Sequence, residues 1–146
     1  MQTELPHPPE KVWTVLVDFA RIAACIPGCE QVEEQAPLSR YSAVMKQKIG
    51  PFKLEVPAEI IVDEHEEPRL VRAHASGKDK LTRTTLGVDL RVDVEPVSAT
   101  TSRLSVHAQL QVAGRLASLG YSMIKKKADE NFAEFERRFL EELNTI

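Results

Sequence analysis

Two cysteines that flank a proline-glycine pair are the first residues of the chain whose spacing could support chemistry. Cys25 and Cys29 could form a redox couple or one half of a zinc site. Thioredoxin-like and zinc-knuckle motifs separate their cysteines by two residues, whereas three residues lie between these two, and no second pair of ligands follows. Pro27-Gly28 is typical of a turn. We interpret the segment as a corner between a helix and a strand, flanked by small hydrophobic side chains, and we predict no metal and no cofactor.

The histidines are the remaining candidates for metal binding or acid–base catalysis. His7, His65, His74 and His107 are scattered singly along the chain. The strand pattern described below predicts that His74 and His107 point away from the core, and His65 lies in an acidic segment. No Ser-His-Asp set and no pair of carboxylates can be assembled from inward-facing positions. The sequence therefore favours a protein that is not an enzyme.

Two short runs of charge could bind partners. The acidic run 63–67, interrupted by His65, is typical of a solvated hairpin tip and could also dock a basic surface. Lys125, Lys126 and Lys127 lie within a predicted helix, where they could form a solvated face or contact anionic lipid or an acidic protein. Clusters that bind lipid generally hold four to eight basic residues, so the solvated face is favoured. Lys127 lies close to the apolar side of the helix and is expected to reach outward past it.

Composition limits the remaining possibilities. The chain has 146 residues, of which 42% are hydrophobic and 28% charged, with a formal net charge of −3. This composition fits one domain over residues 1–146 and gives no overall attraction to nucleic acid. The N-terminal residues contain no targeting signal, and no window approaches the roughly 20 apolar residues of a membrane span. We expect a cytoplasmic protein with reduced cysteines and at most peripheral contact with the inner face of the cytoplasmic membrane.

The periodicity of apolar residues predicts the elements that position these groups. A short strand at 2–5 precedes helices at 10–19 and 18–25, and Pro8-Pro9 suits the start of the first helix. Alternation of apolar and polar residues predicts strands at 29–34, 41–49, 52–62, 71–77, 86–94 and 104–112. An apolar stripe with spacings of mostly three and four predicts a helix over 115–143, about 40 Å long. Within it, Gly120 marks either the point where the helix begins to cross the sheet or a local break.

The order of these elements predicts an α+β fold. Strands that are joined by short turns, each with one apolar and one polar face, form an antiparallel sheet of six or seven strands. The long C-terminal helix covers the apolar face, and the sheet curls around it.

Four phrases, in this order, resemble a known family. They are PPEKVWTVLVDF at 8–19, IPGCEQVE at 26–33, IGPFKLEVPAEI at 49–60 and VAGRLASLGYSMIKKKADENFAEFERRFLEEL at 112–143. Over about residues 2–143 the chain is similar to the CoxG proteins of carbon monoxide dehydrogenase and their relatives, in the START-like (SRPBCC) superfamily. The resemblance implies the helix-grip fold of TBP-like and Bet v 1-like proteins, with two short helices near the N-terminus and a curved antiparallel sheet wrapped around a long C-terminal helix.

The resemblance also implies a functional setting. Members of the family are associated with aerobic carbon monoxide dehydrogenase and related molybdenum hydroxylases, and are thought to tether the enzyme to the cytoplasmic membrane or to serve its quinone acceptor. Several carry a C-terminal extension for the membrane contact, whereas this sequence ends three residues past the predicted helix. The fold's apolar cavity between sheet and helix, which holds a lipid-like or polycyclic ligand, carries over most directly.

The predicted inner face of the sheet is rich in small residues. Its alanines and glycine either leave room for a guest or allow the helix to approach closely, and the sequence does not separate the two outcomes. Register also places the polar Gln47, Thr82 and Thr84 on this face, to orient a ligand or to bond with backbone. The residues expected to line a cavity are Gln47, Phe52, Leu54, Val56, Ala75, Thr84, Leu86, Val88, Leu90, Val106, Ala108, Leu110, Leu119 and Met123.

Three hypotheses of function follow. The leading one is noncatalytic binding of a hydrophobic small molecule, lipid-like or quinone-like, in service of a molybdenum hydroxylase of the carbon monoxide dehydrogenase type. The alternative is a protein-interaction, assembly or membrane-recruitment factor for that enzyme, without a ligand. The least favoured is a cyclase-like or hydrolase-like enzyme of the same superfamily, because an inward acid–base pair is missing.

Overall fold

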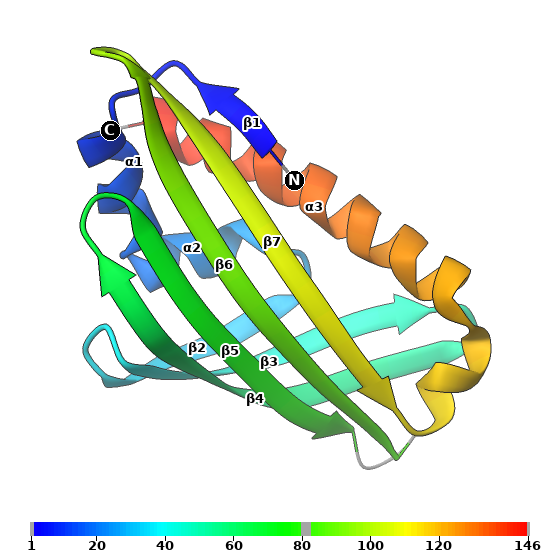
Figure 1. Ribbon diagram of the computed structural model, residues 1–146. Helices are drawn as coiled ribbons and strands as arrows, with labels where there is room; N and C mark the ends of the chain where they lie inside the picture. Colours follow the sequence, from blue (N-terminus) through cyan, green and yellow to red (C-terminus); the bar gives the residue numbers. More distant parts are fainter. Residues whose placement is uncertain (1, 80–82, 146) are drawn as a thin grey trace.

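In the computed structural model, which describes residues 2–79 and 83–145, seven strands form one antiparallel sheet that curves around a long helix (Figure 1). The strands are β1 (Gln2–Leu5), β2 (Cys29–Ala36), β3 (Arg40–Ile49), β4 (Phe52–Glu66), β5 (Leu70–Asp79), β6 (Thr84–Ser98) and β7 (Thr101–Ala113), in the spatial order β1-β7-β6-β5-β4-β3-β2. Helices α1 (Pro9–Leu16) and α2 (Phe19–Cys25) connect β1 to β2, and η1 (Arg115–Leu119) and α3 (Tyr121–Asn144) follow β7. The predicted α+β helix-grip fold is confirmed.

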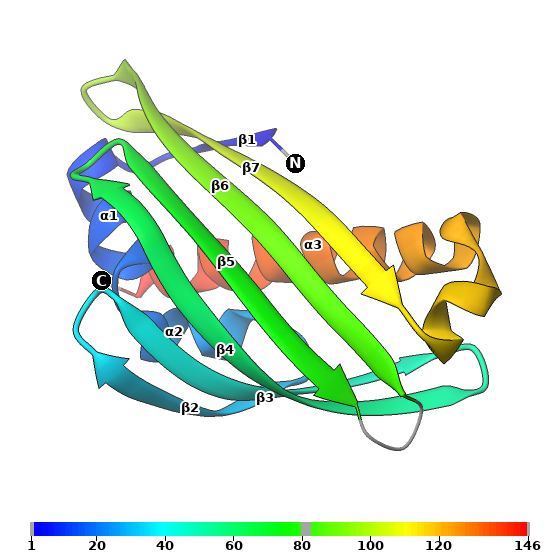
Figure 2. The ribbon, with the colours of Figure 1, turned by 60° about the horizontal axis from the view of Figure 1, so that its bottom comes forward.

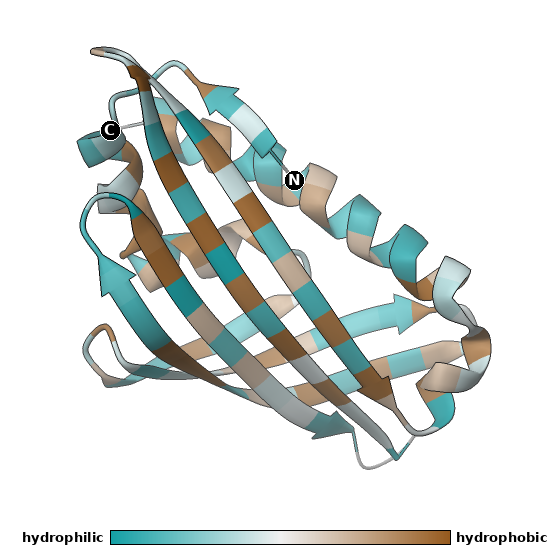
Figure 3. Cartoon of the chain, in the orientation of Figure 1, coloured by the Kyte–Doolittle hydropathy of each residue, from teal (hydrophilic) through white to brown (hydrophobic). Residues whose placement is uncertain are grey.

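The sheet presents one apolar face to α3. Ala75 pairs with Val88, and Val88 pairs with Leu110, so alternate residues of β5, β6 and β7 share this face. Figure 2 shows these strands crossing in front of α3. Figure 3 shows the corresponding alternation of hydrophobic and hydrophilic residues along the strands. Polar residues such as Asp89 and Gln109 take the intervening positions, and these point outward.

The predicted single helix over 115–143 is wrong, because the chain breaks at Gly120. Its φ of 85° and ψ of 164° end the short 3₁₀ helix η1 and start α3. That backbone conformation is essentially restricted to glycine. No neighbouring atom lies within 4 Å of the place where a Cβ would stand. The break therefore depends on the backbone freedom of glycine and not on close packing, and the local break considered for Gly120 is the correct alternative.

The segment from Cys25 to Cys29 is a corner, as predicted. Gly28 has a φ of 80° and lies so close to β3 that a Cβ would approach the Lys46 carbonyl oxygen to 2.0 Å. Cys25 ends α2 and Cys29 begins β2, and both are free thiols. Burial raises the pKa of Cys25 to about 11 and also raises the pKa of Cys29. Neither cysteine is poised as a reactive thiolate.

The acidic run 63–67 lies mainly in a strand, so its assignment to a hairpin tip is only partly right. β4 continues to Glu66, with an irregular register between Val62 and Glu64. Arg72, opposite Glu64 on β5, pairs with it across the strands at 3.1 Å, and Arg69 in the following turn pairs with Glu66 at the end of β4, so both contacts support the longer strand.

Candidate functional site

The residues predicted to line a cavity surround the space between the sheet and the C-terminal helices. From the strands these are Gln47, Phe52, Leu54, Val56, Ala75, Thr84, Leu86, Val88, Leu90, Val106, Ala108 and Leu110, which share the face that looks toward α3. Leu119 ends η1 and Met123 lies in the first turn of α3. Both lie over the turn between β3 and β4, since a Cβ on Gly50 would stand 3.0 Å from Met123 Sδ and 3.6 Å from a Leu119 methyl carbon.

Two hydrophobic clusters fill the ends of this space. The first, called the helix-end cluster, joins α1 and the C-terminal part of α3 to the sheet. Its buried members are Leu5, Val12, Trp13, Val15, Leu16, Cys25, Val71, Val92, Val94, Leu104, Val106, Phe139 and Leu143. The second, called the turn-end cluster, contains buried Leu54, Val56 and Leu116, with Met45, Ile49, Phe52, Leu86, Val112 and Leu119 packed around them. The predicted residues Leu54, Val56 and Val106 thus belong to packed core.

The middle of the inner face is less well covered than its ends. Val88 and Leu110 belong to neither cluster as the structure describes them, although they lie between members of both along β6 and β7. Leu110 is 42% exposed, and its neighbour on the same face, Ala108, is also exposed. Leu104, on the same face of the same strand, is only 1% exposed. On this face of β7, Ala108 and Leu110 are therefore less covered than Leu104 and Val106.

The total accessible surface agrees with this uneven packing. The chain exposes 8500 Å². A compact monomer of 16.4 kDa is expected to expose about 7,500 Å². The difference between the two areas is accessible surface to which an uncovered stretch of the inner face contributes, together with the long hairpins.

The backbone of α3 approaches one side of the sheet more closely than the other. It comes near α1, α2, η1 and strand β3. On that side the Asn131 side chain donates a hydrogen bond to Gln47 Oε1 at 3.3 Å, and Gln47 Nε2 donates to the Pro27 carbonyl at 2.6 Å. These bonds join α3, β3 and the corner after α2. Nothing in the sequence pattern singled out Asn131, because a polar residue at the edge of a helical stripe is common.

The other side of the space opens at the edge of β7. β1 pairs with residues 102–105 of β7, so the edge beyond Ser105 has no strand partner among the described residues. Leu110, in this stretch of β7, is 42% exposed. In the first turn of α3, Met123 is 42% exposed and Tyr121 is 77% exposed. We call the region between residues 106–113 and the first turns of α3 the mouth.

The predicted polar residues of the inner face are held by the protein itself. Thr84 is fully buried, and its hydroxyl accepts a hydrogen bond from the Leu116 amide at 3.3 Å. Gln47 bonds as described above. Thr82 lies outside the described residues. Every buried side-chain nitrogen or oxygen in the described part of the chain has a partner. Both side chains thus bond to backbone groups, which is one of the two roles considered for them.

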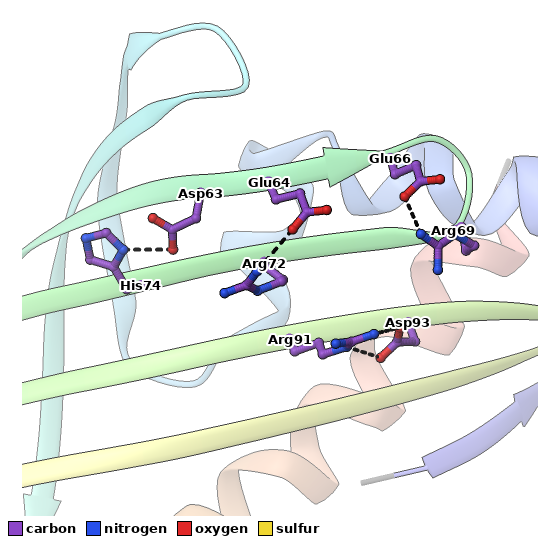
Figure 4. A network of polar contacts seen from close by, with 8 residues as sticks. All are labelled: Asp63, Glu64, Glu66, Arg69, Arg72, His74, Arg91 and Asp93. Atoms are coloured by element: carbon purple, nitrogen blue, oxygen red, sulfur yellow. Dashed lines mark hydrogen bonds and ion pairs between the residues drawn. The ribbon is translucent and has the colours of Figure 1, made fainter.

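Polar chemistry gathers on the opposite, outer face of the sheet. Figure 4 shows His74 bonded to Asp63, Arg91 bonded to Asp93, and the pairs that Glu64 and Glu66 form with arginines. The His74 Nδ1 and Asp63 Oδ2 atoms are 2.8 Å apart. A shallow hollow of about 390 Å³ lies here, lined by Asp63, Arg72, Ala73, Asp89, Leu90, Arg91, His107, Ala108 and Gln109. His74 and His107 point away from the core, as predicted. This hollow is open and its charges are mutually paired, so it offers no water-excluded site for catalysis.

Metal ligands do not converge in the described ranges. No group of three or more His, Cys, Asp or Glu side chains in residues 2–79 and 83–145 could hold a metal ion. His7 is buried beside α1, where its ring bonds to Asn144 Oδ1 at 3.0 Å and ties the N-terminal segment to the end of α3.

The three lysines of α3 differ in their surroundings. Lys125 pairs with Asp129 at 2.7 Å, Lys126 is exposed and Lys127 is partly buried. A wide, open hollow of about 590 Å³ lies on this outer side of α3, lined by Tyr121, Ser122, Lys125, Lys126, Asp129, Glu130 and Ala133. No helix of the described chain is long and apolar enough to cross a membrane.

Known proteins share both the sequence pattern and the fold. Residues 2–144 match the family model of CoxG, a subunit of carbon monoxide dehydrogenase. No curated protein matches the chain.

Solved structures are similar over almost the whole chain. A conserved protein from Geobacillus kaustophilus has a TM-score of 0.89 at 22% identity, covering 99% of this chain and 93% of that one. A START superfamily protein from Mycobacterium smegmatis has a TM-score of 0.75 at 13% identity, covering 99% and 95%. The Zhui aromatase/cyclase from Streptomyces sp. R1128 has a TM-score of 0.70 at 15% identity, covering 99% and 91%. At these identities the likeness establishes a START-like fold.

Proposed function

The chain belongs to the CoxG family of carbon monoxide dehydrogenase, and we propose that it binds an apolar small molecule, lipid-like or quinone-like, between the sheet and α3. In this role it is a noncatalytic accessory protein of a molybdenum hydroxylase of the carbon monoxide dehydrogenase type. The observation that carries the proposal is the partial exposure of Val88, Ala108 and Leu110, which face the interior between two packed clusters.

Burial of apolar surface supplies the binding energy in this proposal. Each Å² of apolar surface removed from water contributes about 25 cal/mol, and a ligand seated on the middle of the inner face covers both its own surface and that of Leu110 and Val88. The guest enters at the mouth. The central lining comes from Ala75, Val88, Leu90, Ala108 and Leu110, whereas Leu54, Val56, Thr84 and Val106 support the walls.

The side chains around the space favour binding over turnover. Of the polar residues near it, Gln47, Thr84 and Asn131 are neutral and bonded to other protein groups. The one buried carboxylate described on this face, Asp79 opposite Thr84, accepts a hydrogen bond from the Glu55 amide at 3.0 Å. A general acid or base must reach its substrate with a titratable group, and neutral amides and hydroxyls do not titrate near neutral pH. The aromatase/cyclase with the same fold shows that the scaffold also supports catalysis. The fold therefore does not rule out an enzyme, and it is the side chains around the space that disfavour turnover.

A matched pair of substitutions on β7 tests the proposal. Ala108→Phe adds a ring on the inner face, and Gln109→Phe adds the same ring on the outer face one residue away. A fluorescent probe of apolar sites, 1-anilinonaphthalene-8-sulfonate, reports binding, and decylubiquinone competes for it. We expect Ala108→Phe to abolish displaceable binding and Gln109→Phe to leave it intact. Loss of binding in both variants, or in neither, would contradict a site on the inner face.

A second candidate function is protein interaction without a ligand. The outer face of the sheet favours it, because the paired charges around Arg72 and Arg91 border an open hollow. In that case decylubiquinone does not bind, and charge reversal at Arg91 weakens association with the partner enzyme while Ala108→Phe does not.

A further inference from the structure

One edge of the sheet is bare along the second half of a long strand. β1 pairs with residues 102–105 of β7 and lies beside the first part of that strand only (Figure 1). Residues 107–113 pair with β6 in an unbroken register, and no described strand pairs with their other side. Every residue from 107 to 111 is exposed. Alternate residues of 107–113, which we call the bare edge, therefore direct backbone N–H and C=O groups outward.

The bare edge lacks the features that normally keep exposed strands apart. Proteins protect the edges of their sheets with charged residues, prolines, bulges or very short strands. The bare edge contains no lysine, arginine, aspartate, glutamate or proline, and its sequence is HAQLQVA. The irregularity in the pairing of β6 with β7 lies between Pro96 and Ser98, at the other end of the two strands. The bare edge is therefore a regular strand that can accept another strand.

β2, at the opposite edge of the sheet, has the protection that the bare edge lacks. It carries Glu30, Glu33 and Glu34, and its pairing with β3 is irregular at two places. Gln31 has a φ of 54°, which is outside the β region. Acidic charge and a broken register both oppose regular pairing with another strand. The two edges of the sheet therefore differ in what they can bind.

A second copy of the chain fits the bare edge because the edge is complementary to itself. Two copies related by a two-fold axis at Leu110 pair antiparallel, and side chains directly opposite each other then lie on the same face. On the inner face, Leu110 of one copy faces Leu110 of the other, and Ala108 faces Val112. On the outer face, Gln109 faces Gln111. Apolar residues thus meet apolar residues, amides meet amides, and no like charges are opposed.

The exposed leucine distinguishes a second copy from a foreign peptide. Leu110 is 42% exposed in the single chain, and in the pair it lies against the same residue of the second copy. Burial of apolar surface on both sides favours the association. Any extended peptide supplies backbone hydrogen bonds, but a foreign one must also bring an apolar residue to this position. The second copy brings it by symmetry.

We propose that two copies of the chain associate through the bare edge, β7 against β7, and join their seven-stranded sheets into one. The arrangement is closed, because each copy uses its bare edge and the edge at β2 is protected. Assembly therefore stops at two copies. The pairing goes beyond the proposed function and requires no ligand.

Sedimentation velocity tests the association directly. The full chain, without added ligand, is measured from about 1 μM to about 500 μM. A single pair of strands is a smaller interface than most stable complexes have, so we expect a reversible dimer with a dissociation constant on the order of 10–100 μM. A chain that stays monomeric throughout this range, or that forms assemblies larger than a dimer, would overturn the proposal.

Paired charges on the bare edge identify the interface and its register. Gln109→Lys combined with Gln111→Lys opposes like charges at both symmetric positions and is expected to raise the dissociation constant at least about tenfold. Gln109→Lys combined with Gln111→Glu opposes unlike charges at the same positions and is expected to preserve the dimer. Loss of the dimer in both variants, or in neither, would overturn pairing about Leu110.

The fold is expected to tolerate the two lysines. Asp89 on β6 lies opposite Gln109, and its carboxylate accepts a hydrogen bond from Gln111 Nε2 at 3.0 Å, so both introduced charges lie near a carboxylate. Circular dichroism checks that the variants remain folded. The control, Gln31→Lys combined with Gln35→Lys, adds the same charge to β2 at the other edge and is expected to change the dissociation constant less than about twofold. An equal loss in the control would show that net charge, and not the bare edge, governs the association.

These outcomes are independent of ligand binding. Displacement of the fluorescent probe is measured at about 1 μM protein, below the expected dissociation constant, so that it reports on the single copy. A chain that dimerises and excludes decylubiquinone refutes only the proposed function. A chain that binds decylubiquinone and stays monomeric refutes only the pairing of two copies.

Discussion

Replacing Leu104 and Leu110 with alanine, one at a time, compares a packed and an unpacked position on the same face of one strand. Leu104 is 1% exposed in the helix-end cluster, and Leu110 is 42% exposed at the mouth. The residue type, the strand and the facing direction are the same. The difference between the two losses of stability therefore measures how well the middle of the inner face is filled.

The expected magnitudes follow from burial. Truncation of a fully buried leucine costs about 2–5 kcal/mol, because apolar contact is lost and a cavity remains, so we expect about 3–4 kcal/mol for Leu104→Ala. Leu110 keeps well over a third of its surface in water, and its truncation adds to a space that is already open. We expect about 1 kcal/mol for Leu110→Ala, from the lost transfer energy alone.

Urea unfolding followed by circular dichroism separates these values. With a slope of about 2 kcal/mol per molar urea, the midpoint falls by about 1.5–2 M for Leu104→Ala and by about 0.5 M for Leu110→Ala. Equal shifts above about 1 M would refute the reasoning, because they would show that Leu110 is packed as tightly as the core and that the helix closes on the sheet.

Three further predictions concern the corner, its thiol and the acid limit of stability. Gly28→Ala is expected to lower the free energy of unfolding in urea by at least about 3 kcal/mol, since φ is positive and a Cβ would stand 2.0 Å from a backbone oxygen. At Gly87 the only atom closer than 3.0 Å to an added Cβ is the flexible end of the Gln111 side chain, so Gly87→Ala is expected to lower it by less than about 1 kcal/mol. Cys25, with its pKa raised to about 11, is expected to resist iodoacetamide at pH 8 in the native state and to react once urea unfolds the chain; rapid labelling of the native protein would contradict its burial. The Arg137 guanidinium, with the adjacent arginine, lowers the pKa of Glu134 from 4.5 to about 2. The stabilising contribution of ionised Glu134 is therefore present above pH 4.5 and is lost as the pH falls toward 2. Glu134→Gln is expected to reduce the fall of the urea midpoint between pH 4.5 and 2. An unchanged dependence on pH would show that the ion pair does not form in solution.

The sequence was sufficient for the fold because its patterns are local. Alternation through β6 and β7 placed Val88 and Leu110 on one face, and this register is what the paired strands show. The corner at Pro27-Gly28 was equally clear, since a turn signal stood where the apolar period changes from that of a helix to that of a strand. The break at Gly120 could be considered but not decided, because a glycine in a helix is tolerated at a cost of about 1 kcal/mol and only the chain geometry reveals its positive φ.

The candidate site was less accessible to sequence reasoning because it depends on distances between elements. Gln47 and Thr84 were placed on the inner face correctly, but their partners, the Pro27 carbonyl and the Leu116 amide, come from distant segments. Asn131 was missed for the same reason, because its partner Gln47 lies 84 residues earlier in the chain.

Native mass spectrometry of the protein, purified without detergent from its own host, tests the central claim most directly. The account predicts a species heavier than the bare chain by the mass of one lipid or quinone, and predicts that Ala108→Phe removes it while Gln109→Phe does not. A bare chain in every preparation, or a bound mass that survives Ala108→Phe, would contradict an apolar guest between the sheet and α3.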